Sequence, residues 1–173
     1  MSPASANLSV AILDDTVCVR IEGRANFASS MDFKRLIFEM IESGHHRFVA
    51  DLTQCLNMDS TFLGVMAKIG LELEKLREET PKAALRLLNP SERIEDLLDN
   101  LGILHLFELV NGEEFEEECL EEVPVGDPAP SKKEISKNCL EAHEILMSIH
   151  PDNIPKFKDV TKFFAEDIKK MAD

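Results

Sequence analysis

The first part of the chain alternates apolar and polar residues in two short runs. Residues 8–13 and 17–22 are rich in β-prone side chains and are separated by Asp14 and Asp15, which are typical turn residues. They predict a β-hairpin whose second strand ends at Gly23. Apolar residues occupy every second position of that strand, so we expect one buried face and one face partly open to water.

After the hairpin the apolar spacing becomes helical. A helix is predicted to begin at Ser29 or Ser30 and to end at Gly44, because apolar residues recur between them at intervals of three and four. The same reasoning predicts three further elements along the chain: a strand at 47–52, a helix that opens at 59–60 and ends near 80–81, and a strand at 84–88.

The segment after the fourth strand carries its own helix-start signals. Asn89 is predicted to cap a helix whose first residue is Pro90, and Glu92 at the third position can bond back to the cap. Gly102 should end this helix, and residues 104–110 form a last strand. A hairpin followed by alternating helices and strands requires crossover connections, which indicates an α/β fold class with a mixed sheet and helices packed on it.

The composition changes after this last strand. Three parts are expected: a first domain at 1–112, an acidic and then proline-rich linker at 113–130, and a C-terminal helical hairpin at 131–173. Ser131 with Glu134 should form a capping box for the first helix of the hairpin, and Pro155 restarts the second. Each amphipathic helix is marginal alone, so the hairpin should pack on the first domain or join two copies in a homodimer.

Charge narrows the class of partner. The chain has 33 acidic and 19 basic residues, a formal net charge of -14. This argues against nucleic acid, because binding to its phosphates requires Lys and Arg. A protein partner is expected instead. No stretch reaches the roughly 20 apolar residues of a membrane span, and the first residues do not have the pattern of a secretory leader, so we expect a cytoplasmic protein.

Cofactor and metal chemistry has no support in the sequence. No glycine-rich phosphate loop, metalloprotease motif or EF-hand loop occurs, so we expect no cofactor and no metal. No histidine has a serine or cysteine at motif spacing, so no catalytic residue is assigned. The four cysteines are far apart, which predicts reduced thiols rather than a zinc site or a disulfide framework: Cys18, Cys55, Cys119 and Cys139.

Ser60 is the strongest candidate for function. An apolar strand ends in Asp-Leu-Thr at 51–53, and Asp59, Ser60 and Thr61 then open an amphipathic helix. These residue types are preferred N-caps, so a purely structural role for Asp59 or Ser60 is one interpretation. A helix N-terminus is also a place where backbone amides and the helix dipole tolerate an added phosphate.

The order of these segments resembles the STAS domain of bacterial anti-sigma-factor antagonists from residue 8 to about residue 112. The most specific part is the segment 58–64, Met-Asp-Ser-Thr-Phe-Leu-Gly, which follows the Asp-Leu-Thr strand end. Leu-Leu-Asn-Pro-Ser at 87–91 and Leu-Gly-Ile at 101–103 support it. The resemblance implies a STAS-like mixed sheet for the first domain.

The resemblance also implies a regulatory, non-enzymatic function. In that family a kinase that is also the anti-sigma factor phosphorylates the serine that matches Ser60. The unphosphorylated form binds this kinase and frees the sigma factor, and a PP2C-type phosphatase resets the switch. Thr61 matches a second hydroxyl position, so it is the alternative phosphorylation residue. Partner contacts are expected from the following segment, whose apolar members would form a docking rim: Asn57, Met58, Asp59, Ser60, Thr61, Phe62 and Leu63.

Two other functions stay open. Family members often have glycine directly after the two hydroxyl residues, where this chain has Phe62, and stand-alone antagonists usually lack a two-helix extension. These departures favour a constitutive scaffold or a lipid-transport-complex subunit that is not phosphorylated. A hydrolase that uses Ser60 as its nucleophile is the third interpretation.

Overall fold

The predicted hairpin forms the antiparallel part of a mixed sheet. The structure is a computed structural model that describes residues 5–126 and 128–171. Its sheet has the strand order β6-β5-β3-β2-β1-β7, and β4 pairs with β2 off this path. The strands are β1 (Asn7–Leu13), β2 (Thr16–Ala25), β3 (Arg47–Asp51), β4 (Cys55–Met58), β5 (Ala84–Leu88), β6 (Glu108–Val110) and β7 (Glu121–Glu122).

Strand direction follows from the connections. A short turn joins β1 to its antiparallel neighbour β2, and β7, far along the chain, pairs antiparallel with the other edge of β1. Helical crossovers join parallel neighbours, so β2, β3, β5 and β6 are parallel. The helices are α1 (Phe27–Glu42), α2 (Ser60–Leu76), α3 (Glu92–Asn100), α4 (Lys132–Ile149) and α5 (Asn153–Met171), with 3₁₀ turns at Leu104–Leu106 and Glu117–Cys119.

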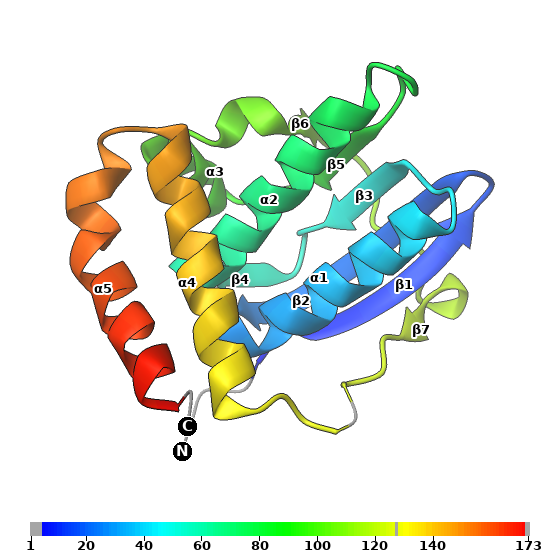
Figure 1. Cartoon of the computed structure of the whole chain (residues 1–173). Coiled ribbons are helices and arrows are strands. Elements are labelled where there is room, and N and C mark those ends of the chain that lie inside the picture. The colour runs from blue at the N-terminus through cyan, green and yellow to red at the C-terminus, as the bar shows by residue number, and fades with distance from the viewer. Residues whose placement is uncertain (1–4, 127, 172–173) are drawn as a thin grey trace.

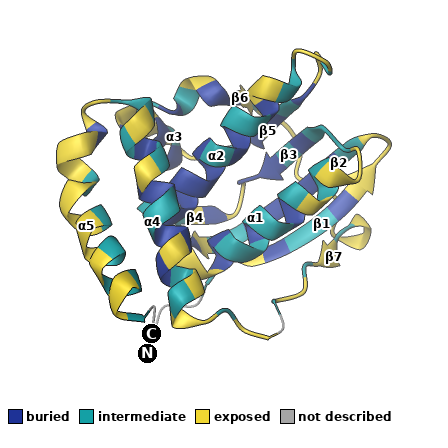
Figure 2. Ribbon diagram, in the orientation of Figure 1, coloured by how far each residue is buried: buried dark blue, intermediate teal, exposed yellow. Residues whose placement is uncertain are grey.

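Helices α1 and α2 lie across one face of the sheet (Figure 1). Their apolar stripes meet there, and the rings of Phe33 and Phe62 stack with centroids 5.1 Å apart. Figure 2 shows that α2 is buried along most of its length, whereas α5 at the outside is largely exposed. Helix α2 is therefore the central helix, covered on one side by the sheet and on another by α4.

The sequence placed most elements correctly but missed several ends. Strand β2 continues past Gly23 to Ala25, because a shift in register at Gly23 lets its end pair with β4, which was not predicted. Both faces of β2 are buried, so the expected wet face is wrong. The side chain of Arg20 lies on that face, and it donates to the backbone carbonyl of Phe115 and lies near the carboxylate of Asp51.

Three predicted helix starts are also wrong. Helix α5 begins at Asn153 and not at Pro155. Helix α1 begins earlier than Ser29, because Asn26 accepts hydrogen bonds from the amides of Ala28 and Ser29. Helix α3 is capped by Ser91 and not by Asn89. Asn89 instead has a φ of 52° and uses its side chain to bind the backbone of Gly112. The end of α3 is confirmed, since Gly102 has a φ of 70°.

The last strand and the acidic segment also differ from expectation. Residues 104–106 form a 3₁₀ turn, so only residues 108–110 are a strand. The acidic segment predicted as part of a linker contains β7, which pairs with the edge strand β1. Residues 1–4 of the predicted first domain, Asp127 of the predicted linker and residues 172–173 of the predicted hairpin lie outside the described residues.

The two C-terminal helices form a hairpin that packs on the rest of the chain. Ser131 caps α4 by accepting from the amide of Glu134, as predicted. Helix α4 contacts both α5 and α2. At the turn between the two helices, the buried amide of Asn153 donates to the carbonyls of Leu101 at 2.9 Å and Leu146 at 2.8 Å. The hairpin is thus joined to the end of α3 as well as to α2.

Substitution of Leu146 in α4 tests whether the hairpin unfolds together with the main core. Its side chain is fully buried within the central apolar cluster, so Leu146→Ala should lower the free energy of unfolding by about 2–5 kcal/mol. Val160→Ala on the exposed side of α5 is the matched control and should change it by less than about 0.5 kcal/mol. Urea unfolding measures both. Equal effects of the two substitutions would show that α4 does not unfold with the core.

The four free thiols should differ sharply in reactivity. Burial raises the pKa of Cys18 and Cys55 to about 11, and it also raises the pKa of Cys139. Cys119 is exposed. At pH 8 only about one in a thousand of the Cys18 or Cys55 thiols is ionised, so iodoacetamide should label Cys119 first. Peptide mass spectrometry measures the rates, with unfolded protein as the control. Rapid native labelling of Cys18 would contradict the prediction.

Candidate functional site

The end of β3 sets the position of the candidate site. Asp51 is buried there, and its Oδ1 accepts from the amide of Thr53 at 3.0 Å and from the hydroxyl of Thr53 at 2.6 Å. This local turn is typical of an aspartate that follows a strand. The chain then forms β4 beside the end of β2 and leads directly into α2. The Asp-Leu-Thr segment therefore has a structural role, because it positions the start of α2.

Asp59 is the N-cap of α2. Its Oδ1 accepts from the amide of Phe62 at 2.8 Å, and its Oδ2 accepts from the amide of Phe27, the first residue of α1, also at 2.8 Å. Burial raises the pKa of the Asp59 carboxyl, while these two hydrogen bonds act in the opposite direction. One carboxylate thus ties together the starts of two helices.

Ser60 is the first residue of α2, and its side chain has a partner that the sequence did not reveal. The hydroxyl Oγ lies 2.7 Å from Nε2 of His143, on α4. The other ring nitrogen, Nδ1, lies 2.6 Å from the carbonyl oxygen of Cys139. A carbonyl can only accept, so Nδ1 carries a proton. In the neutral ring, Nε2 then accepts the Ser60 hydroxyl.

This contact was invisible to sequence reasoning because the two residues are 83 positions apart and belong to different predicted parts of the chain. One signal was available: His143 lies on the apolar stripe of its predicted helix, beside Cys139 and Ala142. A histidine in such a stripe needs a polar partner when the helix packs. It could have marked the face of the hairpin that meets a hydroxyl.

Thr61, the alternative phosphorylation residue, is more deeply covered than Ser60. Its side chain is buried, and its hydroxyl donates to the sulfur of Cys139 at 3.6 Å. Helix α4 therefore contacts both hydroxyl residues at the start of α2. The closer and more polar contact is the one that it makes with Ser60.

The apolar residues of the predicted partner segment do not form a rim on the surface. Met58, Phe62 and Leu63 are all buried, and Phe62 reaches the core to stack on Phe33. The physical reason is that Phe62 lies on the face of α2 that meets α1, where a large ring fills the space between the helices. The rim was expected because Phe62 stands where relatives often have glycine.

The accessible part of the segment is its polar edge together with neighbouring apolar residues. Asn57, Asp59 and Ser60 are partly exposed. Leu56 is 64% exposed and Phe27 is 44% exposed, and Phe27 is bonded through its amide to Asp59. These two side chains are the large apolar groups that the segment and its neighbour leave open to solvent.

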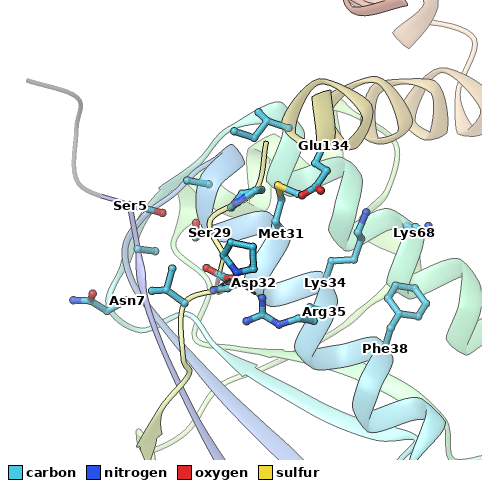
Figure 3. A pocket seen from close by; sticks show the side chains of 17 residues that line it. Ser5, Asn7, Ser29, Met31, Asp32, Lys34, Arg35, Phe38, Lys68 and Glu134 are labelled. Carbon is cyan, nitrogen blue, oxygen red and sulfur yellow. Dashed lines mark hydrogen bonds and ion pairs between the residues drawn. The ribbon is translucent and has the colours of Figure 1, made fainter. Parts of the chain in front are cut away.

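A separate cavity of about 730 Å³ lies between α1, the start of α4 and the segment that precedes α4 (Figure 3). Its cations are already paired: Lys34 donates to Asn138 at 2.9 Å, and Arg35 contacts Asp32 and the carbonyl of Pro124. Neither Ser60 nor His143 lines it. The cavity is therefore distinct from the hydroxyl site.

The described residues contain no arrangement typical of a metal site or of a membrane span. Within residues 5–126 and 128–171, no group of three or more His, Cys, Asp or Glu side chains is arranged to hold a metal ion. Over the same described part of the chain, every helix is too short or too polar to cross a bilayer.

The family model of the STAS domain matches residues 7–116, which ends before β7 and the C-terminal hairpin. A search of curated proteins found no match. Among solved structures, a protein from Thermotoga maritima described as a candidate anti-sigma factor antagonist is 20% identical, with a TM-score of 0.52, covering 61% of this chain and 86% of its own.

Two structures of SpoIIAA are similarly related. The anti-sigma factor antagonist SpoIIAA in its unphosphorylated form is 20% identical with a TM-score of 0.50, covering 62% of this chain and 89% of its own. The Bacillus cell fate determinant SpoIIAA in the phosphorylated form is 19% identical with a TM-score of 0.51, covering 62% and 92%. At these identities the likeness shows the fold. The mixed α/β sheet is confirmed, and the chain belongs to the STAS domain family.

Proposed function

We propose that this protein is a non-enzymatic partner-switching regulator of the anti-sigma-factor-antagonist type, controlled by phosphorylation of Ser60. The observation that carries the proposal is the position of Ser60 as the first residue of α2 in a STAS domain, directly after the N-cap Asp59. SpoIIAA, which has the same fold, is known in an unphosphorylated and a phosphorylated form. In this proposal the unphosphorylated protein binds a kinase that is also an anti-sigma factor, and a PP2C-type phosphatase resets it.

A phosphate on Ser60 would change binding more than stability. The amides and dipole of a helix N-terminus stabilise an anion by about 0.3–1 kcal/mol. The nearby Asp59 carboxylate repels the added negative charge. Because Asp59 is partly buried, water screens this repulsion less. The larger effect falls on a partner surface pressed against Ser60, which would have to desolvate a charge of about -2. Phosphorylation therefore releases a partner and leaves the domain folded.

Partner contacts are assigned to the accessible edge of the site. Leu56 and Phe27 supply exposed apolar area, and Asn57 and Asp59 supply polar groups. Arg93 of α3 donates to the side chain of Asn57 at 3.0 Å, so α3 borders the same surface. A partner that covers these residues also covers Ser60. The buried Met58, Phe62 and Leu63 support this surface from within.

Substitution of Ser60 tests the switch. Ser60→Asp should weaken binding to a kinase-like anti-sigma partner at least about tenfold, because a charge is placed in the contact surface. Ser60→Ala should bind like wild type, and both variants should melt within a few degrees of it. Calorimetry measures binding, and mass spectrometry after incubation with candidate kinases and ATP locates the phosphate. Equal binding by all three proteins would overturn the proposal.

The scaffold alternative makes the opposite prediction in the same experiment. A constitutive STAS scaffold or a lipid-transport-complex subunit would carry no phosphate on Ser60 or Thr61 and would co-purify stably with its complex. These two results together would support the scaffold function and overturn the proposed switch.

The Ser60–His143 contact gives a second candidate function, a hydrolase. A serine hydroxyl 2.7 Å from a histidine nitrogen is the geometry of an activated nucleophile. However, the His143 ring is only 4% exposed, and its Nδ1 is held by a backbone carbonyl instead of a carboxylate. A buried ring without an orienting carboxylate is poorly suited to act as a general base, so we favour the regulatory function.

A fluorophosphonate probe separates the two functions. The probe should fail to label wild-type protein, because His143 and α4 cover the hydroxyl. A known serine hydrolase in the same tube serves as the positive control. Labelling that disappears in both Ser60→Ala and His143→Ala would establish a nucleophilic serine.

A further inference from the structure

The close approach of α4 to α2 begins at Gly64, one helical turn after Ser60. A Cβ atom added at Gly64 would lie 2.4 Å from the carbonyl oxygen of Ala142, a distance that backbone atoms cannot tolerate. The two helices therefore meet backbone to backbone at this point, and Figure 1 shows α4 running alongside the first turns of α2. The hairpin can dock in this way only because residue 64 has no side chain.

The interface under α4 is unusually polar for a helix packed on a core. Asn138 donates to the hydroxyl of Ser30 at 3.0 Å, and Glu141 pairs with Lys34 and Lys68. Polar interfaces of this kind are typical of parts that separate and rejoin. Half of the buried residues of α4 are polar: Ser136, Asn138 and His143, against Cys139, Ala142 and Leu146.

The outer helix adds little burial of its own. Asn153, at the first position of α5, is the one residue of this helix that is classed as buried among those described. Phe163 on the same helix is largely exposed. The hairpin is therefore held mainly by one face of α4. Segments with few buried apolar contacts are the ones that open most readily in a native protein.

The docked hairpin opposes a phosphate on Ser60. The ring of His143 is in hydrogen-bond contact with the Ser60 hydroxyl, and it is enclosed by Phe157 at 5.1 Å and Phe164 at 6.2 Å between ring centroids. A phosphoryl group on Oγ would break this hydrogen bond and press against the ring. Its charge would also lie beside the carboxylate of the partly exposed Asp59.

We propose that the α4–α5 hairpin is an intramolecular gate on Ser60. Docked, it holds the hydroxyl against His143 and occupies the face that a kinase must reach. Released, it exposes Ser60 to phosphoryl transfer from a nucleoside triphosphate. The Oγ–P bond then forms as the bond from the γ-phosphorus to the nucleoside diphosphate breaks, and the hydroxyl proton leaves to a base of the kinase. The phosphate afterwards prevents α4 from docking again. This gate rests on the proposed function of Ser60.

The thiol of Cys139 reports the state of the gate without any partner. It is buried between α4 and α2, whereas Cys18 and Cys55 are buried in strands of the sheet and are expected to react only when the domain itself opens. All measurements use the full chain with Cys119→Ser, which removes the exposed thiol. Iodoacetamide labelling followed by peptide mass spectrometry gives a separate rate for each remaining cysteine.

Gly64→Ala should release the hairpin. The added methyl group collides with the Ala142 carbonyl, so Cys139 should label at least about tenfold faster while Cys18 and Cys55 keep their rates. Gly112→Ala is the matched control, because its nearest neighbour is Leu88 at 3.7 Å, and all rates should stay unchanged. An unchanged Cys139 rate in Gly64→Ala would overturn the gate, since the hairpin would then not depend on this contact.

Ser60→Asp tests the effect of a negative charge at the site. It also replaces Gly64→Ala as the test if that variant unfolds, which faster labelling of Cys18 would reveal. It should raise the Cys139 rate at least about tenfold, whereas Ser60→Ala, which removes the hydroxyl without adding charge, should raise it less than about threefold. Equal Cys139 rates in Ser60→Asp and wild type would overturn the gate.

Failure of the proposed function gives a different result. If Ser60 is not a regulatory phosphorylation site, Cys139 still becomes reactive in Gly64→Ala, but no candidate kinase adds phosphate to any variant. If Ser60 is phosphorylated but not gated, a candidate kinase with ATP modifies wild type and Gly64→Ala at equal rates, and Cys139 labelling is also the same in both. A gated site shows faster phosphorylation of Gly64→Ala than of wild type.

Discussion

The carboxylate of Asp59 bonds to the starts of two helices at once, and the geometry around Ser60 depends on this double contact. One oxygen accepts from Phe62 in α2 and the other from Phe27 in α1. Because both helices begin at the same group, their buried stripes are brought together, and Phe33 stacks on Phe62 between them. The desolvation of this carboxylate is offset in part by two backbone hydrogen bonds, which is how a partly buried charge is usually tolerated.

Helix α2 packs against the sheet and α1 on one side and against α4 on another. Large apolar side chains such as Phe62 and Met66 fill the space toward the sheet and α1, and Gly64 leaves room for the backbone of α4. Phe62 is therefore a core residue, and its difference from the family pattern concerns packing more than recognition. The proposed recognition surface is the narrow edge where Asn57, Asp59 and Ser60 remain partly exposed. The same edge is where the C-terminal hairpin places His143.

The C-terminal hairpin changes what a STAS domain of this kind presents to its surroundings. The family match ends at residue 116, so the helices that cover Ser60 lie outside the matched region. Their contact with the rest of the chain combines a histidine, an amide, an ion pair and a few apolar residues. Such an interface is specific without being strongly hydrophobic. It suits a segment whose docking is meant to be reversible.

Sequence alone determined the elements and their order, because periodicity, caps and glycine stops act over a few residues. The span of β5, the left-handed Gly102 and the Ser131 cap were predictable for this reason. Where two local caps competed, as at Asn89 and Ser91, the tertiary contact of Asn89 with Gly112 decided the outcome. The short strands β4 and β7 also needed a neighbouring strand to form.

For the candidate site, too, one part could be predicted from the sequence and another part depended on tertiary structure. The position of Ser60 behind an N-cap could be predicted from residues 51–64, since a helix start is a local property. The partner of its hydroxyl could not, because the contact with His143 joins groups 83 residues apart and exists only when α4 docks. The sequence by itself determined that a hydroxyl stands at a helix N-terminus in a STAS fold. Only the tertiary structure, through the close approach at Gly64, decided that this hydroxyl is paired with His143.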